Sequence, residues 1–421
     1  MSHEVELKFR IPPDRLAALR RAVATASARR VELAASYVDT PARDLARARG
    51  ALRLRREDHG QGGRWVQTLK AEGRGPLERL EDDQALQADE TPIVDPDRHA
   101  GTLSGAWLAR VLAGAADRTL VERYATRIVR TQRLLRSGGA VVELALDEGE
   151  ITAAAGARRQ PVLELEMELK HGPVQAMLAL AARWVERFGL VLDTRSKSEA
   201  GHLLAEGRAV GAPAKARALP LPPGMASGQA LAALLSDPLR QALANASVLS
   251  DGHGGAEHLH QLRVGLRRLR SVLRLYGELG SDGSSDWSPD WSPDWSDRLA
   301  TLFASLGAQR DADVMAEQLW PALRAAGAPW LADDLAAAAD VAEGDAAPAG
   351  GQASDPVVAL LRQPATQQLW LELLGASAAP GLSAPAAAGA PDDDALDALL
   401  AAPQRALWRQ IRRDATRFSA L

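Results

Sequence analysis

The chain has 421 residues, no cysteine and a net charge of −4 at neutral pH. Its length allows two domains that each bury a core, and the absence of cysteine excludes disulfides and thiolate metal sites. A mildly acidic chain does not attract nucleic acid as a whole, so nucleic acid is not expected as a partner and any polyanion site must be a local cluster of basic residues. The charged N-terminus lacks a signal-peptide core and no segment is apolar enough to span a bilayer, so we expect a cytoplasmic protein without membrane contact.

The first half of the chain has the period of β-strands. From residue 2 to about residue 202, several segments alternate charged and apolar residues. In residues 4–9, Glu-Val-Glu-Leu-Lys-Phe, the three charged side chains share one face of a strand and the three apolar side chains share the other. For any one such strand, a half-exposed sheet is the ordinary explanation. The same alternation returns in residues 52–55, 79–81, 143–147 and 164–170.

Carboxylates on one face of several strands predict a cation site. Such a face is costly unless a cation lies among the carboxylates. If the sheet closes with its charged face inward, carboxylates, arginines and lysines line one cavity, which suits a metal ion that holds a polyphosphate. Oxygen ligands of this kind favour Mg²⁺ or Mn²⁺. Phosphoryl transfer needs charge neutralisation, a positioned water and a metal, and the chain has no Gly-rich nucleotide loop.

The order of these segments resembles the CYTH domain of the triphosphate tunnel metalloenzymes. Residues 4–8 match its Glu-x-Glu-x-Lys signature. The resemblance implies an α+β fold for residues 1–206, built on an eight-stranded antiparallel β-tunnel. The rest of the pattern follows in order as residues 37–41, 52–55, 69–70, 79–81, 126–130, 143–149, 164–170 and 196–199.

The resemblance also implies roles at the matching positions. Glu4, Glu6 and Lys8 form the expected catalytic group, and the proton acceptor stays open between a lysine and a carboxylate. Glu81 and Glu168 serve either as ligands or as partners that orient basic residues. The expected metal ligands are Glu4, Glu6, Glu143, Asp147, Glu164 and Glu166. The expected phosphate-binding residues are Lys8, Arg53, Arg55, Lys70, Arg79, Arg130 and Lys197.

Inorganic triphosphate, hydrolysed to diphosphate and phosphate, is the expected substrate. Within the family, thiamine triphosphate and the cyclisation of ATP are alternatives, and no segment of this chain is suited to recognising a nucleobase. An inactive tunnel that only senses phosphate polymers is a further alternative. Four of the five lysines of the chain fall on the motif positions, which favours a role for them in holding phosphate.

A helical second half follows a linker predicted at residues 207–228, which are rich in Ala, Pro and Gly. Residues 260–276 predict a helix with an apolar seam at three-four spacing. Beside the seam runs a basic stripe without acids at four-residue spacing, and its aligned cations repel one another unless an anion is bound. A merely solvated surface helix is the alternative. The stripe consists of His260, Arg263, Arg267, Arg270 and Arg274.

This helix resembles the first signature of the CHAD domain, and residues 310–314 resemble its next landmark. The resemblance implies an all-α helical bundle over residues 229–421 that binds inorganic polyphosphate. No histidine follows His260, and residues 407–421 resemble the segment before a second signature helix. We therefore expect an incomplete bundle, through either truncation or a missing repeat. His253 and His258 are expected in a loop before the helix.

Overall fold

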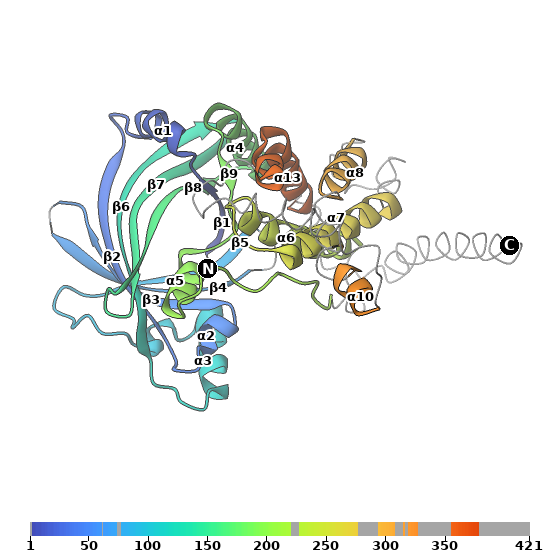
Figure 1. Cartoon of the computed structure of the whole chain (residues 1–421). Helices are drawn as coiled ribbons and strands as arrows, with labels where there is room; N and C mark the ends of the chain where they lie inside the picture. The colour runs from blue at the N-terminus through green and yellow to red at the C-terminus, as the bar shows by residue number, and fades with distance from the viewer. Residues whose placement is uncertain are drawn as a thin grey trace, which may run out of the picture. The chain divides into compact units, whose positions relative to one another are not determined.

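The computed structural model describes residues 2–60, 62–73, 77–219, 227–276, 294–307, 315, 319–326 and 355–378. Two compact units are present (Figure 1). One runs to Ala212 and takes in α13 (Pro364–Ser377) from Trp370 onward, and the other holds Pro213–Leu369. The landmarks predicted at residues 310–314 and 407–421 lie outside the described residues.

A closed antiparallel sheet forms the first unit. Its strands follow the order β5-β4-β3-β2-β6-β7-β8-β1, and β1 pairs back onto β5, which closes a ring of eight strands. The predicted α+β fold with an eight-stranded tunnel is confirmed. The two-residue strand β9 (Val191–Leu192), paired with the end of β1, is an addition. The eight strands are β1 (Ser2–Arg10), β2 (Arg29–Asp39), β3 (Gly50–Asp58), β4 (Gly63–Glu72), β5 (Glu78–Ala85), β6 (Val121–Ser137), β7 (Ala140–Ala153) and β8 (Arg158–His171).

Helices interrupt the strand pattern that the sequence predicts for this unit. In α4 (Val174–Phe188), Met177, Ala181, Trp184 and Val185 are buried at three-four spacing, which is the period of a helix. From the sequence, this half of the chain was described by its strand alternation, and the helix was not predicted. Two 3₁₀ turns, η1 (Pro13–Arg15) and η2 (Pro96–His99), are also present. The helices are α1 (Leu16–Val23), α2 (Asp44–Arg47), α3 (Leu103–Gly114), α4 (Val174–Phe188) and α5 (Lys197–Ala205).

The main apolar core lies on the outer side of the ring. Leu7, Phe9, Leu144 and Met167, which point outward, are no more than 2% exposed, and α1 and α4 contact β7 while α4 also contacts β8, the strands that carry Leu144 and Met167. Around Leu52, residues of α2, α3 and neighbouring strands form a second apolar cluster. Because helices cover the outer face, the charged face of the strands is turned inward.

Part of the inner face is apolar and holds α5. Tyr37 and Tyr124 stack at 4.6 Å between ring centroids within a cluster against which Ala200 and Leu204 of α5 pack. The Tyr124 hydroxyl donates a hydrogen bond to Ser198 Oγ at 2.9 Å. A Cβ atom at Gly201 would collide with the Tyr124 ring. The position of α5 is therefore fixed by close packing.

The second unit is helical in the part that the structure describes. Helix α7 packs between α6 and α8, and its predicted leucine seam is buried, with Leu262, Leu266 and Leu269 fully enclosed. Among the described residues, no helix combines the length and apolar character that a membrane crossing requires. The helices of this unit are α6 (Ser227–Leu249), α7 (Ala256–Tyr276), α8 (Trp295–Ser305), α10 (Trp320–Ala325) and α12 (Pro356–Arg362).

The start of α7 corrects one expectation. The helix begins at Ala256, so His258 lies inside it and is buried, and its predicted loop position is wrong. Gly254, at a φ of +87°, and Gly255 lie directly before the helix, and the left-handed conformation that glycine adopts easily separates the preceding segment from it. His253 does lie outside the helix, as predicted. The glycine pair marks the boundary more closely than the leucine seam does.

Candidate functional site

Strand register places the predicted charged residues on the inner face of the ring. Lys8 lies opposite Glu166, Glu164 lies opposite Asp147, and Asp147 in turn lies opposite Arg130. Directly paired residues point to the same face of a sheet. By the same alternation, the other predicted residues that point to the inner face are Glu4, Glu6, Arg53, Arg55, Lys70, Glu81, Glu143 and Glu168.

Three of the predicted metal ligands form a tight cluster. Asp147, Glu164 and Glu166 each offer a carboxylate oxygen, and these oxygens lie within 4.8 Å of one another. Arg130 donates hydrogen bonds at 2.7 Å to both oxygens of Asp147 and one at 2.5 Å to Glu166. Lys197 Nζ contacts all three carboxylates and lies 2.7 Å from Asp147 and from Glu166. Two cations therefore lie among three acids, one fewer than full neutralisation requires.

Burial and these cations act in opposite directions on the cluster. Burial raises the pKa of Glu164 in spite of Lys197. Burial would also raise the pKa of Glu166 and Asp147, but Lys197 and Arg130 outweigh it and hold both pKa values below the usual range. Although burial opposes the charge on Lys197, the three carboxylates raise its pKa well above normal. Of the three acids, Glu164 thus holds a proton most readily.

A second cluster surrounds Lys70, on strands β1, β4 and β5. Lys70 Nζ lies 2.6 Å from Glu81 and 3.3 Å from Glu4. Burial raises the pKa of Glu4 to about 9. The pKa of Glu81 is lowered, because Lys70 and the hydrogen bond with Glu4 outweigh its burial. At neutral pH, Glu4 therefore carries a proton that it shares with Glu81.

The six predicted metal ligands do not all gather at one point. Glu143 lies 3.6 Å from Lys170, which also contacts Glu168 at 2.6 Å. Glu6 lies opposite Glu168 in the register of β1 and β8. The 4.8 Å cluster thus contains three of the six predicted carboxylates, whereas Glu4 contacts Lys70 and Glu143 contacts Lys170.

The predicted phosphate-binding arginines differ in their surroundings. Arg53 donates a hydrogen bond to the Tyr37 hydroxyl at 3.1 Å, and Arg55 forms an ion pair with Glu57. The Nε atoms of Arg53 and Arg55 are buried without a hydrogen-bond acceptor among the described residues. The backbone of Arg79 pairs with Glu4, but its side chain lies outside the described part of the structure.

Two residues of this interior were not predicted from the sequence. Arg10 lies 3.1 Å from Asp193, which Arg195 also contacts at 2.7 Å. Arg10 continues the parity of residues 4, 6 and 8, so the alternation of β1 contained a signal for it. Asp193 follows β9, whose two residues are too short to give a period.

The clustered carboxylates fit a divalent cation. Their donor set consists of oxygen atoms only, which Mg²⁺ and Mn²⁺ prefer. The three side chains are buried or half-buried, and a group of buried acids is stable only when a positive charge lies close. In the structure Lys197 and Arg130 supply that charge.

The basic stripe of α7 is a separate candidate site. Arg263 donates to the backbone oxygen of Phe303 at 3.2 Å and stacks over its ring at 4.2 Å, and Arg270 lies 6.0 Å from the same ring. Arg267 and Arg274 are exposed. Within the part of the chain that the structure describes, no arginine of the stripe pairs with a carboxylate. Two of the four thus rest against α8, and two face solvent.

The closed sheet and its charged interior define a β-tunnel protein with a helical companion unit. Within that class, residues 2–198 match the CYTH domain family and residues 233–421 match the CHAD domain family. The chain is a CYTH–CHAD protein. The inorganic triphosphatase of Haemophilus influenzae is 30% identical to it over 210 residues, which are 48% of this chain and 55% of that protein. The chain thus spans about half the length of this curated relative.

Three solved structures are similar to parts of the chain. A Hippeastrum protein, described as a putative adenylyl cyclase with a dominant triphosphatase activity, is 19% identical with a TM-score of 0.35, over 49% of this chain and 97% of its own. A Pyrococcus horikoshii protein is 22% identical with a TM-score of 0.33, over 49% and 99%. The CHAD domain of Ricinus communis is 28% identical with a TM-score of 0.31, over 39% and 52%.

Proposed function

We propose that the closed sheet hydrolyses inorganic triphosphate to diphosphate and phosphate with bound Mg²⁺ or Mn²⁺. The observation that carries the proposal is the group of Asp147, Glu164 and Glu166 within 4.8 Å, in an interior that also holds the cations Arg130 and Lys197. Membership of the CYTH family and similarity to an inorganic triphosphatase support it. We propose a cytoplasmic location for this activity.

Unsatisfied donors in the interior support an anionic substrate. A buried guanidinium N–H without an acceptor costs about 1–3 kcal/mol or more, and both Arg53 and Arg55 carry one. Phosphate oxygens would supply the missing acceptors, and guanidinium groups bind them through two parallel hydrogen bonds. The arginines therefore gain hydrogen bonds when a triphosphate is bound.

In the proposed reaction, Asp147, Glu164 and Glu166 hold the metal and the basic residues hold the phosphates. When bound, the metal supplies charge neutralisation and polarises the bond that breaks. Lys197 and Arg130 contact the carboxylates in the structure. When triphosphate is bound, they donate some of their hydrogen bonds to phosphate oxygens instead. Lys8 faces the same interior opposite Glu166 and orients the phosphate chain against the carboxylates.

Phosphate release from tripolyphosphate tests the proposal. We expect release with Mg²⁺ or Mn²⁺ and none with chelator, and a loss of at least about 100-fold in kcat for Glu166→Gln, as for other groups that stabilise transition-state charge. Glu150→Gln is the matched control, because Glu150 lies on the outer face of β7 and pairs with Arg159 at 3.1 Å. Release in chelator would contradict the metal requirement. Faster turnover of thiamine triphosphate or ATP would replace the substrate, and no turnover of any of the three would leave a phosphate-sensing tunnel.

For the helical unit we propose that the α7 stripe binds inorganic polyphosphate. Membership of the CHAD family supports this, as do the exposed Arg267 and Arg274, whose charges no described carboxylate offsets. Polyphosphate presents a row of phosphates at close spacing, to which aligned arginines on one helix face are suited.

A further inference from the structure

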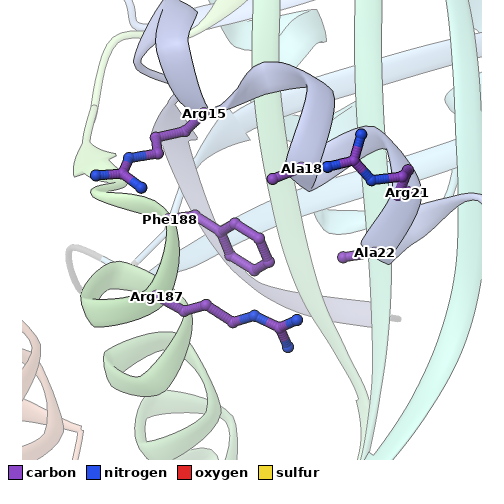
Figure 2. Close-up of a pocket in the computed structure, with 6 residues that line it drawn as sticks. All are labelled: Arg15, Ala18, Arg21, Ala22, Arg187 and Phe188. Carbon is purple, nitrogen blue, oxygen red and sulfur yellow. The ribbon is translucent and has the colours of Figure 1, made fainter.

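A pocket of about 290 Å³ lies in the first unit, between α1 and α4 on the outer side of the closed sheet. The functions proposed above make no use of it. Figure 2 shows the Phe188 ring at its centre, with the Arg15 guanidinium to the left of the ring, Arg21 to its right and the Arg187 guanidinium below it. Its remaining lining residues are Ala18 and Ala22.

The pocket lining is strongly basic. It contains three arginines and no acid. The ion pair of Arg15 among the described residues is with the exposed Asp14 at 3.2 Å, a type of pair that contributes little. Among the described residues, neither Arg21 nor Arg187 pairs with a carboxylate. The carboxylate of Glu148 on the neighbouring strand accepts from Arg20 at 2.9 Å, and Arg20 does not line the pocket.

One of these arginines, the exposed Arg187, lies against an aromatic ring before any ligand arrives. The Arg187 guanidinium lies 5.0 Å from the centroid of the Phe188 ring, a cation–π contact. Phe188 is 2% exposed and packs against Trp184 with 5.0 Å between ring centroids, so the ring is a rigid support. A guanidinium restrained by such a contact loses less conformational freedom on binding.

The chemistry of the lining selects a small, highly charged anion. Guanidinium forks bind phosphate oxygens bidentately, and the volume lies close to the lower end of small-molecule pockets, about 300 Å³. Three arginines spread around one ring suit a chain of phosphate groups better than a single phosphate. We propose that this pocket is a second anion site that binds an oligophosphate outside the tunnel, a ligand class whose choice rests on the proposed function.

A fluorophore at the rim tests binding in this pocket alone. Since the chain has no cysteine, Ala17→Cys in the full chain gives one labelling position, exposed and next to Ala18. With chelator present, we expect a saturable response to tripolyphosphate. Arg21→Ala with Arg187→Ala should weaken the apparent affinity at least about 10-fold, since hydrogen bonds to charged groups are lost. The control Arg136→Ala, which changes an exposed arginine outside the lining, should leave it unchanged.

Two further comparisons separate this site from the tunnel. Glu166→Gln should not change the fluorescence response of the label at residue 17 to tripolyphosphate, called the rim response. The variant with Arg21→Ala and Arg187→Ala should hydrolyse triphosphate at the normal rate and melt at the normal temperature. No saturable response, loss of the response in Glu166→Gln, or a stronger response to an acidic peptide would overturn the proposal. An intact rim response without hydrolysis would overturn the proposed triphosphatase activity alone.

Discussion

Among the cations that the structure describes, Lys197 contacts the largest number of carboxylates. It lies at the first position of α5 and contacts Asp147, Glu164 and Glu166 at once. Taking one partner out of a buried ion pair leaves an uncompensated charge, at a cost of about 3–5 kcal/mol. In this protein three acids would share that loss, so the side chain contributes to stability as well as to the proposed phosphate binding.

We predict that Lys197→Met lowers the free energy of unfolding by about 3–5 kcal/mol in chelator, and that Mg²⁺ restores part of it by binding the folded state. Urea unfolding with and without metal measures both effects. Lys170→Met is the control: Lys170 is 38% exposed, so its loss should cost no more than about 1 kcal/mol. Equal losses in the two variants, or no recovery with Mg²⁺, would be inconsistent with this account.

Glu4 gives a prediction about pH. Its pKa is about 9 in the folded protein against 4.5 for the free group, so the folded state binds more protons between these values. Its contribution is fully present below pH 4.5 and is lost as pH rises towards about 9. Glu4→Gln copies the protonated form, and we expect its stability relative to the parent to increase from about pH 5 to about pH 8 in chelator. Chemical unfolding at several pH values measures the difference, with Glu150→Gln as control, and a gap independent of pH would refute the shared proton.

Among the secondary-structure elements, α5 positions Lys197 at the acidic cluster. The helix is held on the inner face by Tyr124, which donates to Ser198 and packs edge-on to His202 at 5.0 Å between ring centroids. Gly201 lies against the Tyr124 ring, where a side chain has no room. Packing at Gly201 and charge balance at Lys197 are therefore coupled through one short helix.

We predict that Gly201→Val displaces α5 and lowers both stability, by about 1–3 kcal/mol through overpacking, and triphosphate turnover. Gly211→Ala is the control, since a Cβ atom there meets its neighbours only at ordinary contact distances of 3.6 Å or more. Thermal melting and phosphate release are measured on both variants. Normal turnover in a destabilised Gly201→Val protein would show that α5 does not position Lys197 for the reaction.

For the whole molecule, a net charge of −4 means that polyanions bind to local clusters against the overall field. We therefore predict that polyphosphate binding weakens steeply with salt, and that Arg267→Ala with Arg274→Ala reduces both the affinity and the salt dependence. Triphosphate hydrolysis should not change. Binding isotherms at several salt concentrations measure this, with the exposed Arg208→Ala as control. An unchanged affinity in the double variant would place the polyphosphate site elsewhere.

The sequence could predict features that depend on local residue spacing, and it could not predict features that depend on contacts between distant segments. The alternation of residues 4–9 requires only the geometry of one strand, and it correctly turned Glu4 and Lys8 inward. The contact of Lys197 with Asp147 depends on how α5 docks, and the pairing of Glu143 with Lys170 depends on tertiary register. Neither follows from local spacing. The ring of eight strands came from family resemblance, and the start of α7 was missed because the leucine seam is shorter than the helix.

The closure of the ring also determines when the first unit can fold during synthesis. Strand β1 pairs on its two sides with β5 and β8, both of which lie later in the chain. The nascent sheet therefore keeps open edges until residue 171 has been translated, and Lys197 arrives later still. Pairing over such sequence distances is slow, and unpaired strand edges associate with other chains. We therefore expect the yield of folded protein to depend on how quickly the ribosome passes from β5 to β8.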